Sequence, residues 1–139
     1  DVERSRGLGD VYKRQIPNYT AVENVALPLE INFQKDALSQ AKEILVDLGL
    51  EDRLQHFPSQ LSGGEQQRVA IARAMIKKPE LILADEPTGN LDDENTEVIT
   101  ELIFNIATKY QKSLCLVTHD ADLAKRCDRI MTIENGTVV

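Results

Sequence analysis

The sequence predicts an α/β fold in which a helical lobe precedes a largely parallel sheet, and two observations support this prediction. Two apolar runs with the length of buried strands, 81–84 and 113–118, are separated by a stretch with helical apolar spacing. Strands that alternate with helices in this way favour parallel pairing. Upstream of them, residues 36–57 show only helical signals, which indicates a separate helical lobe.

Length and composition restrict the class of protein. The 139 residues suffice for one domain or part of one, and 42% hydrophobic with 28% charged residues is typical of globular proteins. No apolar run approaches the roughly 20 residues that span a bilayer. A net charge of −7 disfavours a phosphate backbone, so we expect no nucleic-acid partner. The two cysteines form no metal-binding pattern, which fits a reducing, cytoplasmic setting.

Two helices are predicted between residues 20 and 49. Thr20 is a candidate N-cap for a short helix over 21–27, which Pro28 ends. A second helix begins after Asp36, a candidate N-cap, and Gly49 supplies its C-cap. The apolar residues of this second helix recur at helical spacing: Ala37, Ala41, Ile44, Leu45 and Leu48.

A capping box starts the next predicted helix, at Ser62, Gly63, Gly64 and Glu65. The helix runs toward two lysines at 77 and 78 and stops at Pro79. Bare backbone N–H groups at its start, together with the positive end of the helix dipole, form a site suited to phosphate. The alternative is that these residues simply cap the helix, as serine and glycine do in many proteins.

The C-terminal part of the chain alternates strands with helices. A buried strand over 81–84 is followed by an amphipathic helix and by a second strand over 113–118. A short helix over 121–125 and a last strand over 129–133, followed by a turn at 134–136, complete the pattern. The amphipathic helix is marked by Val98, Leu102, Ile106 and Tyr110.

Three side chains that can carry chemistry follow the two predicted strands. Asp85 and Glu86 come directly after 81–84, and His119 follows 113–118. Because ligands of open α/β folds bind at the carboxyl ends of parallel strands, all three are expected at one ligand-binding edge. Taken singly, an acidic turn is usually solvated and a lone histidine is usually a polar strand end, so the convergence is the stronger signal.

The segments Leu-Ser-Gly-Gly-Glu-Gln-Gln-Arg at 61–68 and Leu-Ile-Leu-Ala-Asp-Glu-Pro at 81–87 resemble the signature and Walker B motifs of ATP-binding-cassette (ABC) ATPases. The resemblance covers most of the chain from Ile16 onward. It implies a partial P-loop NTPase fold of the ABC nucleotide-binding type, with a helical lobe and signature helix over about 20–80 and an α/β part from Walker B to the switch histidine over 81–139. It also implies ATP and Mg²⁺ as the bound species.

The resemblance implies a role for each candidate residue. Asp85 would hold Mg²⁺ through its water shell, Glu86 would polarise the attacking water, and His119 would contact the γ-phosphate. Asp92, in a turn at 87–92 that resembles the D-loop, would communicate between two ATP sites. The helix start would contact the ATP held by a partner subunit through Ser62, Gly63, Gly64 and Glu65, the last standing where many family members have glutamine.

Residues 84–92 and 20–25 resemble most closely the subgroup of lipoprotein-release, macrolide-export and cell-division ABC ATPases. This implies an ATP-hydrolysing subunit that couples hydrolysis to a membrane subunit for export or extraction. The implied assembly is a homodimer of the intact ATPase domain, peripheral on the cytoplasmic face of the cell membrane.

Two features depart from the family pattern. Residues 1–15 show no sustained strand or helix period, and 7–15 resembles translated sequencing adaptor, so we expect a non-native or disordered leader before a domain fragment at 16–139. The phosphate-cradling loop G-x-x-x-x-G-K-[ST] does not occur in the sequence. We therefore expect a C-terminal fragment that is inactive alone; the alternative is a degenerate regulatory or docking module of ABC origin.

Because the sequence contains no phosphate-cradling loop, we predict that the 139-residue chain binds Mg-ATP weakly or not at all. Titration calorimetry of the purified chain with ATP and Mg²⁺ measures this. Stoichiometric binding accompanied by turnover would contradict the prediction.

Overall fold

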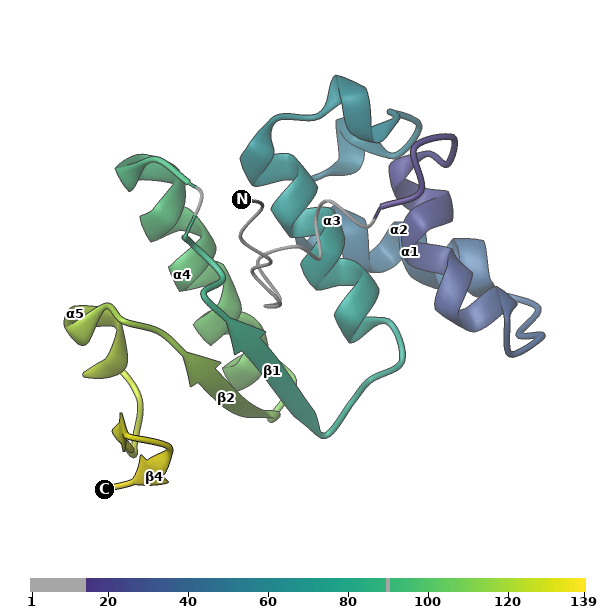
Figure 1. The fold of residues 1–139 in the computed structure, drawn as a ribbon. Helices are drawn as coiled ribbons and strands as arrows, with labels where there is room; N and C mark the ends of the chain where they lie inside the picture. Colours follow the sequence, from purple (N-terminus) through teal and green to yellow (C-terminus); the bar gives the residue numbers. More distant parts are fainter. Residues whose placement is uncertain (1–14, 90) are drawn as a thin grey trace.

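The computed structural model describes residues 15–89 and 91–139, and Figure 1 shows two groups of elements. Three helices, α1 (Ala21–Glu30), α2 (Ala37–Asp47) and α3 (Gly63–Met75), lie together, with two short 3₁₀ turns, η3 (Glu51–Arg53) and η4 (Pro58–Gln60). The second group contains β1 (Leu81–Asp85), α4 (Asp93–Lys109), β2 (Ser113–Val117), α5 (Ala121–Ala124), β3 (Ile133–Glu134) and β4 (Thr137–Val138). The predicted leader, except Gln15, lies outside the described residues.

Helix α1 begins at the predicted N-cap but ends later than predicted. The Thr20 backbone N–H and hydroxyl donate to Glu23 Oε2 at 2.7 and 2.8 Å, completing a capping box. The predicted end at Pro28 is wrong, because the helix continues through it to Glu30. A proline inside a helix removes one backbone hydrogen bond, whereas the extra turn buries Leu29 in the core.

The two predicted caps of α2 have different outcomes. Asp36 occupies the N-cap position, but its side chain makes no cap hydrogen bond, because its backbone (φ −104°, ψ 24°) is not the extended form that aims the side chain at the helix. Gly49 has the expected left-handed φ of 73°. The N–H of Gly49 donates to Val46 O and that of Leu50 to Leu45 O, which forms a Schellman motif.

A buried asparagine fastens the chain before α1. Asn24 is fully buried, and its Oδ1 accepts from the Ile16 N–H at 2.8 Å. Its Nδ2 donates to the backbone oxygens of Ile16, Tyr19 and Thr20 at 3.2, 2.9 and 3.1 Å. The amide thus bonds four backbone groups: its oxygen accepts one hydrogen bond, and its two N–H groups are shared among three carbonyl oxygens.

The predicted parallel sheet is confirmed, and β1 pairs with β2 from Leu81 opposite Ser113 to Asp85 opposite Val117. One face of this sheet packs on helices, since Ala84 is buried and Ile82 contacts the core cluster. The other face is open, with Leu81, Leu83 and Val117 all at least half exposed, which differs from the buried strand predicted at 81–84.

Helix α4 buries a face displaced by about one residue from the predicted one. Its buried residues are Ile99, Thr100, Ile103, Ile106 and Ala107. Val98 and Tyr110, predicted to mark the apolar face, are 41% and 36% exposed. The Tyr110 hydroxyl instead donates to Asp47 Oδ2 at 2.9 Å, beside Lys109 Nζ at 2.7 Å, which ties the end of α4 to the end of α2.

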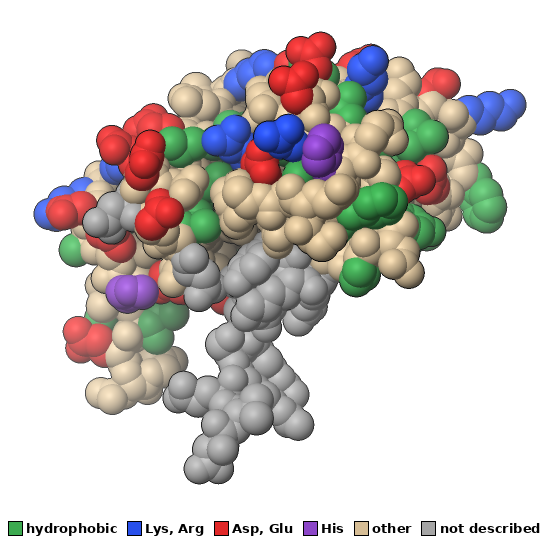
Figure 2. Space-filling model, turned by 90° about the horizontal axis from the view of Figure 1, so that it is seen from above, with side chains coloured by type: hydrophobic (Ala, Val, Ile, Leu, Met, Phe, Trp, Pro, Cys, Tyr) green, Lys and Arg blue, Asp and Glu red, His purple; other side chains and the backbone are tan. Residues whose placement is uncertain are grey.

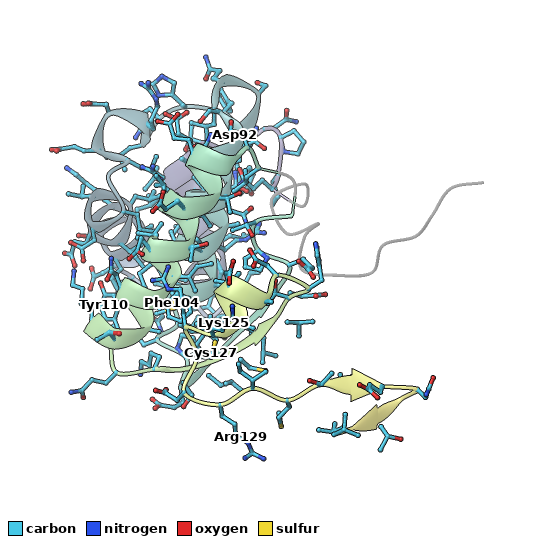
Figure 3. All side chains as sticks on the ribbon, turned by 90° about the vertical axis from the view of Figure 1, so that its left-hand side faces the viewer. Asp92, Phe104, Tyr110, Lys125, Cys127 and Arg129 are labelled. Atoms are coloured by element: carbon cyan, nitrogen blue, oxygen red, sulfur yellow. The ribbon has the colours of Figure 1, made fainter. Side chains whose placement is uncertain are left out.

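The last predicted strand, 129–133, is wrong in extent. The structure has a short hairpin of β3 and β4, which Figure 3 shows projecting from the rest of the chain. Asn135 and Gly136 have φ angles of 50° and 79°, as a two-residue hairpin turn requires. Thr132 and Val139 exchange two backbone hydrogen bonds and extend the ladder by one pair.

Surface charge is mixed on the face drawn in Figure 2, where acidic and basic side chains are interspersed over the helices. No helix in the described ranges has the length and apolar character needed to cross a membrane.

We predict that replacing Asn24 by leucine, which has a similar size, lowers the free energy of unfolding by about 2–4 kcal/mol, because four backbone groups each lose a hydrogen bond to the Asn24 amide. Urea unfolding of the 139-residue chain measures the change. Asn32→Leu is the control and should cost under about 1 kcal/mol, since the exposed side chain of Asn32 makes one hydrogen bond among the described residues, to Pro28 O. Equal losses in both variants would contradict the role of Asn24.

Candidate catalytic edge and phosphate-facing helix start

Glu86 lies on a strained turn directly after β1. Its φ is 44°, a left-handed value that costs a residue with a side chain on the order of 1–3 kcal/mol. Two hydrogen bonds hold this backbone: the Glu86 N–H donates to Val117 O at 2.8 Å, and Glu86 O accepts from the Gly89 N–H at 3.1 Å. The first continues the β1–β2 ladder by one residue, so β2 sets the position of Glu86.

The Glu86 carboxylate contacts His119, as their predicted location at one sheet edge requires. Its Oε1 accepts from the His119 backbone N–H at 2.8 Å and lies 2.7 Å from the ring Nδ1. A carboxylate only accepts, so Nδ1 carries the proton in this contact. The His119 side chain is 85% exposed and that of Glu86 34% exposed, which leaves the pair open to a ligand.

Asp85 is the last residue of β1. It is one of the residues that line a cleft of about 80 Å³ between α3 and β1, together with Gln67, Ala70 and Pro87. None of the hydrogen bonds or ion pairs found among the described residues uses this carboxylate. Nor do the described residues gather three His, Cys, Asp or Glu side chains around one point that could hold a metal ion.

The predicted capping box at the start of α3 is confirmed. The Ser62 N–H donates to Glu65 Oε2 at 2.8 Å, and the Glu65 N–H donates to the Ser62 hydroxyl at 3.2 Å. Arg53 Nε donates to the other oxygen of Glu65, also at 2.8 Å. The Ser62 N–H and, less strongly, Arg53 lower the pKa of Glu65. Within residues 15–89 and 91–139, no acceptor was found for the N–H groups of Gly63 and Gly64, which remain available to an anion.

Asp92 caps α4, and this cap meets the start of α3. The side chain of Asp92 accepts from the Asn95 N–H at 2.8 Å and from Asn95 Nδ2 at 2.9 and 3.0 Å, and the Asn95 N–H lowers its pKa. Figure 3 shows Asp92 at the N-terminal end of α4. A Cβ at Gly64 would lie 2.8 Å from Asn95 Oδ1, so glycine permits the close approach of the two helix starts.

Two residues near the site were not predicted from the sequence. Asn95 supports Asp92 and contacts Gly64, and Gln67 Nε2 donates to Pro87 O at 2.7 Å. Gln67 lies in the signature-like segment, but no local pattern indicates a hydrogen bond to a residue 20 positions away. Gln15, to which no role was assigned, is buried and donates to Gln66 O at 2.7 Å.

The structure therefore forms two clusters of predicted site residues. Glu86 and His119 are in direct contact, with Asp85 adjacent in sequence, and the Ser62–Glu65 helix start packs against the cap at Asp92. No hydrogen bond among the described residues joins one cluster directly to the other. Gln67 connects the helix of the second cluster to the turn of the first.

Comparisons of the sequence with known proteins agree on one family. The profile of the family described as ABC transporter matches residues 3–89, a range that starts before the described residues. The lipoprotein-releasing system ATP-binding protein LolD of Shewanella oneidensis is 49% identical over 137 residues, which are 96% of this chain and 60% of that protein. LolD of Nitrobacter winogradskyi is 47% identical over 147 residues, covering 100% of this chain and 63% of the relative. The chain thus spans about 60% of the length of these curated relatives.

Comparison of the fold with solved structures finds ABC transporter cassettes. The dimeric structure of MJ0796, described as a bacterial ABC transporter cassette, has a TM-score of 0.74 and 41% identity, over 90% of this chain and 56% of that one. A dimeric post-hydrolysis state of MJ0796 bound to ADP and Pi has the same TM-score and coverage at 40% identity.

We predict that Glu65→Gln removes stability that is present at neutral pH and absent in acid. Because the folded state holds the pKa of Glu65 below its ordinary 4.5, the ionised carboxylate stabilises the chain above that pH, and the contribution is lost as pH falls through the folded value. At pH 7 the variant should be less stable by about 0.5–1 kcal/mol, a small value because the side chain is partly exposed.

Urea unfolding at pH 7 and at successively lower pH measures the free energy of unfolding of the unmodified chain and of Glu65→Gln. The difference between the two values should shrink in acid. The control is Glu43→Gln, since no hydrogen bond or ion pair of Glu43 was found among the described residues. A difference that stays constant with pH would contradict the prediction.

Proposed function

The chain belongs to the ABC transporter family and has the α/β fold of its nucleotide-binding cassette, and we propose that it is part of an ATP-hydrolysing subunit of an export- or extraction-type transporter. The observation that carries this proposal is the contact between Glu86 and His119 at the carboxyl edge of a parallel sheet. The similarity to two proteins named lipoprotein-releasing system ATP-binding protein supports the extraction class of transport.

Glu86 is suited to act as the general base toward water. His119 occupies Oε1 with two donors, so the carboxylate cannot rotate freely, whereas Oε2 receives no hydrogen bond from the described residues. A water molecule bound to Oε2 would be oriented for attack on a phosphoryl group. The exposed His119 ring would contact the γ-phosphate from the same edge.

The other site residues would hold the nucleotide and its metal. Asp85 ends β1 beside Glu86, and no partner of its carboxylate was found among the described residues, so it is suited to hold Mg²⁺ through water, as hard cations prefer oxygen ligands. Bound Mg²⁺ would neutralise charge on the phosphates. The Ser62–Glu65 helix start, with its free N–H groups at Gly63 and Gly64, would contact the γ-phosphate of ATP held by a second copy, and Asp92 would lie between the two ATP sites.

The proposed organisation places the helical lobe at about 20–80 and the α/β part at 81–139, after a leader at 1–15. The working unit would be a homodimer of the intact domain bound to a membrane subunit at the cytoplasmic face of the cell membrane. Because the phosphate-cradling loop does not occur in these 139 residues, the chain alone would not turn over ATP.

The proposal is tested in an extended chain, in which residues 16–139 follow the upstream segment of the Shewanella oneidensis relative. Glu86→Gln should lower the ATPase kcat by about 10²–10⁴-fold, the usual contribution of a general base, and should accumulate an ATP-bound dimer. Steady-state kinetics and size-exclusion chromatography measure these effects.

The matched control is Glu97→Gln on the exposed surface of α4, which should hydrolyse ATP like the unmodified chain. If Glu86→Gln hydrolyses ATP at the unmodified rate, the role of Glu86 is refuted. If the unmodified extended chain hydrolyses no ATP, the docking-module alternative is favoured.

A further inference from the structure

Gln67 joins the two clusters of the site within one chain. We infer that Gln67 is a positioning residue: its hydrogen bond to the Pro87 carbonyl holds the turn that orients Glu86, so that the phosphate-facing start of α3 and the carboxylate of the same chain move together. The catalytic consequence of this inference rests on the proposed function. The tie between α3 and the turn, made by the Gln67–Pro87 hydrogen bond, does not depend on it.

The first observation is the hydrogen bond from Gln67 Nε2 to Pro87 O at 2.7 Å. Pro87 is buried and immediately follows Glu86. Gln67 is the one donor to this carbonyl found among the described residues. Because a buried carbonyl that loses a donor is costly, the loss of Gln67, the one donor found for Pro87 O among the described residues, would weaken this geometry of the turn.

The second observation is that the far end of the same turn also rests on α3. Gly64 lies against Asn95, which the Asp92 cap holds in place, and a Cβ at Gly63 would be 3.8 Å from Leu91 Cδ2. Pro87 is therefore hydrogen-bonded to the second turn of α3, and the Leu91 side chain lies against its first turn.

The third observation is the strain at Glu86. Its left-handed backbone is maintained by the turn that follows, where Gly89 donates to Glu86 O and Leu91 donates to Thr88 O. Both hydrogen bonds lie in the segment that Gln67 fixes. If the Pro87 carbonyl is released, the turn can relax toward an ordinary backbone conformation and carry the Glu86 carboxylate away from His119.

A shift of α3 would consequently reorient the Glu86 carboxylate through the Gln67–Pro87 hydrogen bond. The apolar core would not need to rearrange. In the proposed dimer, the start of α3 contacts ATP held by the other copy, whereas Glu86 acts on ATP held by its own copy. Gln67 would thus link occupancy of one ATP site to the geometry of the other.

Hydrogen exchange of the 139-residue chain tests the tie without requiring activity. Gln67→Glu keeps the size of the side chain, loses the donor and points a carboxylate at the carbonyl. It should raise exchange of the Gly89 and Leu91 amides about tenfold. Gln67→Lys, which supplies a donor again, should restore protection, whereas Gln67→Leu should not.

Asn32→Asp is the matched control, because Asn32 Nδ2 also donates to a proline carbonyl, Pro28 O, at 2.7 Å. This variant makes the same chemical change at the α1–α2 turn and should leave exchange in 86–92 unaltered. Unchanged exchange of this segment in Gln67→Glu, or equal loosening in Asn32→Asp, would overturn the inference.

ATPase kinetics of the extended chain test the catalytic consequence. Gln67→Glu and Gln67→Leu should lower kcat about tenfold with little change in KM for ATP, and Gln67→Lys should recover most of kcat. A rise in KM at constant kcat would overturn the positioning role. If the unmodified extended chain hydrolyses no ATP, the proposed function fails, whereas the exchange experiment still decides whether the tie exists.

Discussion

The parallel register of β1 against β2 determines where the candidate catalytic groups lie. Pairing of Asp85 with Val117 places the ends of both strands level, and the Val117 carbonyl then accepts the N–H of Glu86 one residue beyond the strand. This contact positions the backbone of Glu86 at the strand end, and the carboxylate of Glu86 contacts His119 there. Had the strands paired one residue out of register, the two side chains would lie on different faces, and neither could orient the other.

Helix α3 is the second organising element, because it contributes to both the core and the site. Its buried residues Val69, Ala72 and Met75 join the apolar cluster of α1 and α2, which fixes the axis of the helix. Its first turn presents free N–H groups, and its second turn donates to Pro87. The packing of α3 against the helical lobe thus holds a polar helix start in an exposed position, where the ends of isolated helices normally fray.

Most of the local capping signals in the sequence were confirmed, although Pro28 does not end α1 and the side chain of Asp36 makes no cap hydrogen bond. The capping residues Thr20 and Ser62 and the Gly49 C-cap work through hydrogen bonds within a few residues, and all three are present. Predictions that depend on packing were less successful. The apolar face of α4 was displaced, because Val98 and Tyr110 are apolar by type but are not the side chains directed at α3 and the sheet. The contact between Gln67 and Pro87 spans 20 positions, and a propensity rule contains no information on such a pair. The convergence of Glu86 and His119 was predictable because parallel strands impose it.

The open face of the two-stranded sheet has a consequence for the behaviour of the chain in solution. Leu81, Leu83 and Val117 form an apolar surface beside the exposed thiol of Cys115, and the strand pairings found in the described residues leave one edge of β1 and one of β2 unpaired. Unpaired strand edges next to apolar side chains are templates for strand addition by another molecule. Purification at high concentration without a reductant would therefore favour self-association through this sheet, and the oxidised material would contain intermolecular disulfides at Cys115.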